Sequence, residues 1–123
     1  MMSHSPRFGV LVLPNQSWST ILEQTQQVER LGFDLVAMAD HFVDWSDVSR
    51  PWLEGWSILT AVAMATSRIR LATYVSQIPL RHPAMLARQA LTVDHISSGR
   101  LEVGLGTGIA IDPSYDTDSY THL

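Results

Sequence analysis

Residues 31–41 read LGFDLVAMADH and carry three signals in a row. Gly32 stands where a helix would need a left-handed C-terminal cap. Residues 35–39 are apolar without alternation, as expected of a parallel strand that is covered on both faces. Asp40 and His41 follow at the carboxyl end of this strand, where ligands gather in parallel α/β folds. The stretch therefore predicts the end of a helix, a buried strand and a candidate functional loop.

Similar units recur about every 30 residues, which is the size of a βαβ unit. Apolar runs predict three further strands, at residues 8–13, 68–75 and 100–105. Helices are expected between the strands: one with a capping box at Thr20 and Glu23, one over residues 53–66 and one over residues 84–96. This alternation predicts an α/β fold with parallel strands.

The loops favour a barrel over an open doubly wound sheet, the other architecture that such an alternation permits. The segments after the second and third strands, residues 40–51 and 76–83, are long and unusual in composition. The return connections, at residues 31–34, 66–68 and 98–100, are short. This asymmetry is typical of a barrel with a single working face.

Composition excludes several chemistries. The chain has 123 residues without cysteine, its eight basic residues are all arginine, and twelve acidic residues give a net charge of −4. Disulfides, thiolate nucleophiles, Schiff-base lysines and a Walker lysine are therefore excluded. The scattered arginines do not form the basic patch that a nucleic acid would need. We accordingly expect no nucleic-acid partner.

We expect one partial domain over residues 1–123, whose last segment, residues 109–123, has no hydrophobic period and is expected to be loosely ordered. The charge-free run at residues 55–67 is shorter than the roughly 20 residues that span a bilayer. No signal-peptide pattern is present near the N-terminus. A cytoplasmic location without membrane association is therefore expected.

Asp40 and His41 are the first candidates for chemistry. Neighbouring side chains on a strand diverge, so at most one of the two can point into the mouth of a sheet or barrel. A histidine there can donate, accept or bind metal near neutral pH, or it can simply pin the loop. Asp44 and Asp47 lie close in sequence, but no helical pair of histidines accompanies them, and a metal site is not expected.

The glycine-rich run at residues 104–108 reads GLGTG and fails the dinucleotide fingerprint, because Ile109 stands where the third glycine should be. Glycines at a strand end either let a flat ligand approach the backbone or serve a turn that needs positive φ. Trp45 and Trp52 are candidates for the wall of a substrate pocket. Arg81 is expected to be a solvated or helix-capping arginine rather than an anion ligand.

These segments, taken in order, resemble the bacterial luciferase-like family of flavin-dependent oxidoreductases. The similarity extends over residues 7–108. The matching pieces read FGV at residues 8–10, LGFD at 31–34, ADH at 39–41, PWLEGW at 51–56, TSRIRL at 66–71, PLRHP at 79–83, LARQ at 86–89, DHISSGR at 94–100 and GLGTG at 104–108. The ordered combination is specific, although each piece alone is common.

The resemblance implies the N-terminal half of a (β/α)8 TIM barrel. It implies that His41, preceded by Asp40, lies beside the reactive edge of a flavin and is catalytic. It implies a cis peptide between Tyr74 and Val75 that supports the ring from behind. It also implies that the backbone of residues 106–108, Gly106, Thr107 and Gly108, lies against the ring system.

The implied cofactor is reduced FMN or, in the alternative branch of the family, a deazaflavin coenzyme. The implied reaction on a small organic substrate is oxygenation or hydride transfer. Because the family needs eight strands and this chain supplies four, we expect the chain as it stands to be truncated and impaired. The alternative interpretation is a half-barrel without catalytic function that forms a homodimer or binds a completing chain.

Overall fold

The computed structural model describes residues 4–115 of the chain. Its strands are parallel and form one sheet in the order β1-β2-β3-β4. The elements are β1 (Gly9–Val12), α1 (Trp18–Arg30), β2 (Leu35–Met38), α2 (Gly55–Ala65), β3 (Arg70–Gln77), α3 (Pro83–Ile96) and β4 (Leu101–Gly106). The predicted α/β alternation is confirmed, and each predicted strand boundary lies within two residues of the observed one.

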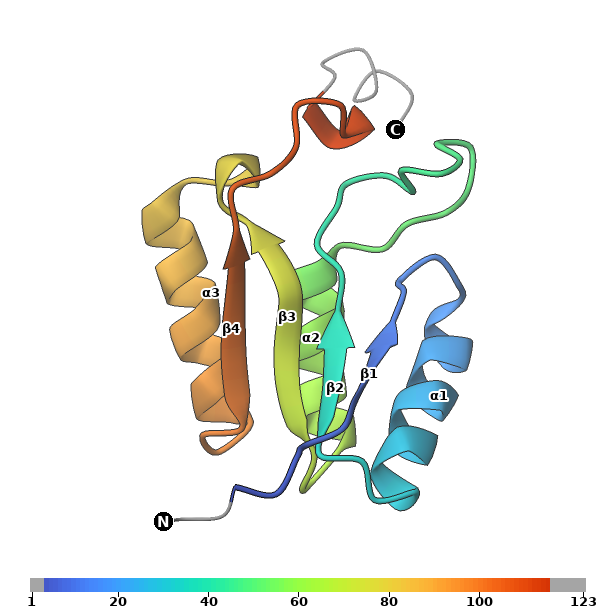
Figure 1. Cartoon of the computed structure of the whole chain (residues 1–123), viewed down its shortest axis with the longest axis vertical. Helices are drawn as coiled ribbons and strands as arrows, with labels where there is room; N and C mark the ends of the chain where they lie inside the picture. The colour runs from blue at the N-terminus through green and yellow to red at the C-terminus, as the bar shows by residue number, and fades with distance from the viewer. Residues whose placement is uncertain (1–3, 116–123) are drawn as a thin grey trace.

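The three helices pack against one face of the sheet (Figure 1). Their apolar sides meet the strand residues that point the same way, and the resulting core contains Ile21 of α1, Leu59 and Val62 of α2, and Val36 and Leu71 of the sheet. The core therefore sits between the helices and the sheet. Within residues 4–115, no helix is both long enough and apolar enough to cross a membrane.

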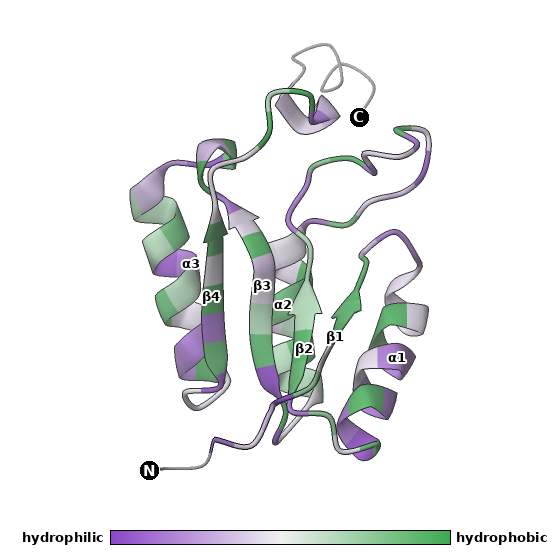
Figure 2. Ribbon diagram, viewed as in Figure 1, coloured by the Kyte–Doolittle hydropathy of each residue, from purple (hydrophilic) through white to green (hydrophobic). Residues whose placement is uncertain are grey.

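The other face of the sheet carries no helix in this part of the chain and exposes large apolar side chains. Leu11 is 47% exposed, Leu13 is 39% exposed and Tyr74 is 69% exposed. Figure 2 shows that β1 and β2 are apolar along most of their length. Strands of this composition are expected where both faces of a parallel sheet are covered. The face is therefore built like the interior of a barrel.

The ends of α1 show one wrong and one confirmed prediction. The expected capping box at Thr20 and Glu23 does not begin the helix. Ser17 is the N-cap, and its hydroxyl accepts the backbone N–H of Thr20 at 3.3 Å. Ser17 has an extended backbone and precedes the first helical residue, so its oxygen can reach the free N–H groups of the first turn. Gly32 has the expected positive φ, +85°.

β3 is the longest strand and ends irregularly. The pairing between β3 and β4 shifts register between Thr73 and Ser76. The peptide bond between Tyr74 and Val75 lies inside this irregular stretch and is cis. Beyond the shift, β3 continues to Gln77, two residues past the expected end. The carboxyl end of the sheet thus presents Tyr74 and Val75 on a bulge and Gln77 beyond it.

The structure describes residues 109–115 of the segment after β4, where a loosely ordered tail is expected over residues 109–123. A short 3-10 turn at Pro113–Tyr115 packs over the carboxyl end of the sheet (Figure 1). The buried Asp112 and Ser114 hydrogen bond with the loop after β2. Such partners are distant in sequence, so no local period reveals them. The remainder of the expected tail, residues 116–123, lies outside the described residues.

Candidate functional site

A pocket of about 350 Å3 opens at the carboxyl ends of β2, β3 and β4. Seven residues that the sequence singled out line it: His41, Trp45, Tyr74, Val75, Gly106, Thr107 and Gly108. Three further lining residues were missed, namely Gln77, Ile109 and Asp112. A volume above about 300 Å3 and a largely apolar wall with a few polar groups are typical of ligand pockets.

Of the two tryptophan candidates, Trp45 lines this pocket and Trp52 does not. A neighbouring hollow on the open face of the sheet is lined by Trp45, Trp52 and His41, together with Leu11 and Leu13. The ring of His41 meets Trp52 edge-on, with centroids 5.5 Å apart, and lies 6.3 Å from the ring of Trp45. His41 therefore stands between the two hollows, with aromatic walls on one side.

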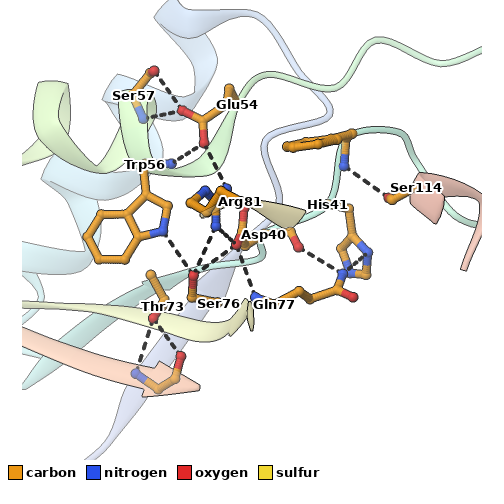
Figure 3. Close-up of polar contacts among 12 residues, drawn as sticks. Asp40, His41, Glu54, Trp56, Ser57, Thr73, Ser76, Gln77, Arg81 and Ser114 are labelled. Atoms are coloured by element: carbon orange, nitrogen blue, oxygen red, sulfur yellow. Dashed lines mark hydrogen bonds and ion pairs between the residues drawn. The ribbon is translucent and has the colours of Figure 1, made fainter. Parts of the chain in front are cut away.

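Asp40 does not line the pocket, although His41 beside it does. Its side chain is only 1% exposed, and the guanidinium of Arg81 donates to both carboxylate oxygens at 2.6 and 2.7 Å (Figure 3). The hydroxyl of Ser76 and the backbone N–H of Gln77 also donate to Asp40, at 2.9 and 3.1 Å. Asp40 thus ties the end of β2 to the end of β3 through a buried network.

Arg81 is not the solvated or helix-capping arginine that the sequence suggested. Its side chain is 10% exposed and lies between Asp40 and Glu54, whose Oε1 is 3.3 Å from Nη2. The hydrogen bond from Arg81 to Asp40 raises the pKa of the guanidinium above its ordinary value. Glu54 also accepts the N–H groups of Trp56 and Ser57, which begins α2. The network therefore fixes the start of α2 as well.

Gln77 is the residue that joins this buried network to the pocket. Its side-chain Nε2 lies 2.9 Å from the carbonyl oxygen of Asp40, from Nδ1 of His41 and from Oδ2 of Asp112. Its Oε1 accepts a hydrogen bond from the hydroxyl of Tyr115. No motif marks Gln77 in the sequence, since its partners lie 35 to 38 residues away.

Asp112 reaches the other side of His41. Its Oδ2 lies 2.7 Å from His41 Nδ1, and its Oδ1 accepts the backbone N–H of Ser114 at 2.8 Å. Burial raises the pKa of the Asp112 carboxyl, but the hydrogen bonds from Ser114 and Gln77 outweigh burial and hold that pKa below its ordinary value. An ionised carboxylate therefore adjoins the candidate histidine.

The glycines of the 104–108 run have packing reasons for being glycine. A Cβ on Gly106 would collide with the side chain of Val75, and a Cβ on Gly108 would collide with the Tyr115 hydroxyl. Gly108 also has a positive φ of +78°. The turn interpretation is thus sufficient for Gly108, while Gly106 allows β4 to approach the bulge of β3. Both glycines still line the pocket.

The acidic residues of the loop after β2, Asp44 and Asp47, accept hydrogen bonds within the loop. Asp44 accepts the N–H and the hydroxyl of Ser46 at 2.9 and 2.6 Å, and Asp47 accepts the same groups of Ser49 at 3.1 and 2.6 Å. These bonds lower the pKa of both carboxyls. In the described part of the chain, no three His, Asp or Glu side chains are grouped so as to hold a metal ion.

Comparison with known proteins shows that the chain is similar to oxidoreductases. The chain is 31% identical over 102 residues to 4-hydroxyprotoasukamycin monooxygenase of Streptomyces nodosus, and this match covers 76% of the chain and 26% of the relative. It is 37% identical over 95 residues to the F420-dependent glucose-6-phosphate dehydrogenase of Segniliparus rotundus, and this match covers 75% of the chain and 28% of the relative.

A solved structure agrees with the fold. The coenzyme F420-dependent tetrahydromethanopterin reductase of Methanopyrus kandleri superposes with a TM-score of 0.76 and 28% identity, over 87% of this chain and 28% of that protein. The chain thus spans little more than a quarter of the length of each of these proteins. The model of the family described as luciferase-like monooxygenase matches residues 1–112. The chain therefore belongs to the luciferase-like monooxygenase family.

Proposed function

We propose that this chain supplies the cofactor-facing half of a flavin-dependent oxidoreductase active site. The cofactor is a reduced flavin, either FMN or a deazaflavin, and it binds in the pocket at the carboxyl ends of β3 and β4. The observation that carries the proposal is the lining of this pocket: His41 on one side, the β3 bulge on another and the glycine-rich end of β4 on a third.

The pocket fits a flat, largely apolar ring better than a charged group. Tyr74 and Val75 are 69% and 36% exposed and offer an apolar support. Gly106, Thr107 and Gly108 offer backbone and one hydroxyl. No Arg lines this pocket among the described residues, so the phosphate of such a cofactor would have to bind elsewhere.

His41 is the residue assigned to proton transfer or hydrogen bonding at the ring edge. Its side chain is 26% exposed and lies within the pocket wall, and an imidazole can exchange a proton near neutral pH. Asp40 has a supporting role here, because both of its oxygens are occupied by Arg81. Trp45 and Trp52 would exclude water and support an organic substrate beside His41.

The bound cofactor would supply either oxygenation or hydride transfer, and the protein would supply orientation and solvent exclusion. The similarity to F420-dependent enzymes favours testing the deazaflavin branch along with FMN. A small organic substrate follows from either branch.

Fluorescence titration of the chain with FMN and with F420, in separate experiments, tests the proposal. Saturable binding of one of the two at 1:1 stoichiometry is expected, and His41→Ala is expected to weaken it by about tenfold, the loss of roughly one hydrogen bond in the site. His95→Ala changes an exposed histidine on α3 and is the matched control. Absence of saturable binding by either compound, or equal losses in the two variants, would refute the proposal.

A second candidate is a half-barrel that pairs with another copy of itself. The open apolar face of the sheet, including Leu11, Leu13 and Tyr74, favours it. Large exposed apolar patches are typical of interaction surfaces. Sedimentation velocity distinguishes the two candidates: a discrete dimer that binds neither cofactor supports this one, and a monomer rules it out.

A further inference from the structure

The ring nitrogen Nδ1 of His41 has two close polar neighbours that make opposite demands on it. Oδ2 of Asp112 lies 2.7 Å away, and when the carboxyl is ionised this oxygen accepts hydrogen bonds but cannot donate one. Nε2 of Gln77 lies 2.9 Å away and can only donate. Nδ1 therefore carries a proton if it donates to Asp112 and carries none if it accepts from Gln77.

The hydrogen bonds that the Gln77 amide donates determine whether Nδ1 of His41 donates or accepts. The Gln77 amide has two N–H bonds and three neighbours at 2.9 Å: the carbonyl of Asp40, Oδ2 of Asp112 and Nδ1 of His41. If its two hydrogens go to Asp40 and Asp112, each acceptor is satisfied. Nδ1 must then donate its own hydrogen to Asp112.

The alternative arrangement leaves a repulsive contact. If Gln77 donated to Nδ1, the lone pair of Nδ1 would be engaged, and Oδ2 of Asp112 would face a second acceptor at 2.7 Å. That arrangement requires a protonated carboxyl. The Asp112 carboxyl is held ionised by its bonds from Ser114 and Gln77, whose effect on its pKa exceeds that of burial.

We propose that Asp112 is a positioning residue that holds neutral His41 in the tautomer with hydrogen on Nδ1. The second nitrogen, Nε2, then carries a free lone pair. His41 makes no hydrogen bond through Nε2 to residues 4–115, and its side chain lines the pocket. His41 is thereby prepared to accept a proton or hydrogen bond from a ligand, and its action at a flavin rests on the function proposed above.

The tautomer can be read without any cofactor. Long-range 1H–15N correlation spectra of histidine-labelled protein, at about pH 8.5 where ordinary histidines are neutral, distinguish a protonated from an unprotonated ring nitrogen. We expect the Nδ1–H form of His41 to exceed the Nε2–H form by about ten- to a hundredfold, as a hydrogen bond to a charged group implies.

His82 provides an internal control in the same spectrum. Its Nδ1 accepts the backbone N–H of Ala84 at 3.2 Å at the start of α3. His82 is therefore expected to show the opposite tautomer, with hydrogen on Nε2. The two histidines together calibrate the assignment.

Two substitutions sharpen the test. Asp112→Ala removes the acceptor and leaves Gln77 Nε2 beside Nδ1, so the tautomer of His41 should reverse. Asp47→Ala removes a carboxylate of the neighbouring loop and should leave it unchanged. A wild-type His41 with hydrogen on Nε2 overturns the proposal by itself, even if the variants fail to fold, and so does an unchanged tautomer in Asp112→Ala. Failure of cofactor binding with the expected tautomer would instead count against the proposed function alone.

Discussion

The two ends of the sheet carry ion pairs of the same kind in different surroundings. At the amino-terminal end, Glu102 of β4 pairs with Arg70 of β3 and with Arg7, and the side chains are 32%, 39% and 58% exposed. At the carboxyl end, Asp40 and Arg81 are 1% and 10% exposed. Water and salt screen the first cluster and reach the second far less. The difference in burial predicts that the ion pair at the carboxyl end contributes more to the stability of the fold than the cluster at the amino end.

The largest predicted effect follows from breaking the buried pair. Arg81→Met leaves the Asp40 carboxylate buried without its cation, and we expect a loss of about 3–5 kcal/mol in the free energy of unfolding, measured with urea. Arg88→Met makes the same change at an exposed position of α3 and should cost little. The double variant Asp40→Asn with Arg81→Met should lose less than Arg81→Met alone, because it removes the buried unpaired charge and leaves only the 37% exposed Glu54 without its arginine. Equal stability of Arg81→Met and Arg88→Met would contradict this account.

An intermediate effect is expected at Glu29, a carboxylate near the amino end that binds backbone instead of arginine. Its Oε2 accepts the N–H groups of Ser67, Arg68 and Ile69 at 3.1, 2.8 and 2.8 Å. Burial raises the pKa of Glu29, but these three hydrogen bonds lower the pKa by more than burial raises it and leave it below its ordinary value. The Glu29→Gln substitution should cost about 1.5–2 kcal/mol at pH 7, the low end of the range for a hydrogen bond to a charged group, because Glu29 is only half-buried and water screens its charge.

The stability lost in Glu29→Gln should depend on pH, and the direction of this dependence follows from the lowered pKa of Glu29. A carboxyl whose pKa is lower in the folded state stabilises the fold fully above its unfolded pKa, about 4.3, and loses this contribution as pH falls through its folded value. The difference between wild type and Glu29→Gln should therefore shrink on acidification from pH 7 to about pH 3. A difference that grows on acidification would show that the hydrogen bonds do not favour the ionised form.

The smallest effect is expected at Glu102. Its pKa is lowered chiefly by the hydrogen bond from Arg7, with a smaller contribution from Arg70, against the effect of burial. Exposed pairs are worth about 0–1 kcal/mol, and we expect Glu102→Gln to stay within that range in urea unfolding. The loss should fall further in about 0.5 M salt, where screening is strong. A loss as large as that of Arg81→Met would remove the contrast between the two ends.

The sequence predicted the elements better than the contacts between them. Apolar runs and helix-stop signals located each strand, because those signals are local. The N-cap at Ser17 was missed because Thr20 and Glu23 offer a similar spacing three residues later.

The site was predicted in part. His41 and the glycines after β4 were singled out by their places at strand ends, Tyr74 and Val75 through resemblance to a family, and these residues do meet at one pocket. Gln77, Asp112 and the pairing of Arg81 were missed, because Arg81 meets Asp40 across 41 residues and Asp112 meets His41 across 71. Such pairs come together only when the strand order is known. Asp112 also stood in a polar segment whose composition resembles a loose tail.

Amide chemical-shift mapping of the chain, titrated separately with FMN and with F420, tests whether the pocket at the carboxyl end of the sheet binds the cofactor. We expect the shifts to concentrate at the carboxyl end, on Tyr74, Val75 and residues 106–108, while the amides of Arg70 and Glu102 at the amino end stay unchanged. Shifts centred on the amino end, or no saturable shifts with either compound, would contradict it.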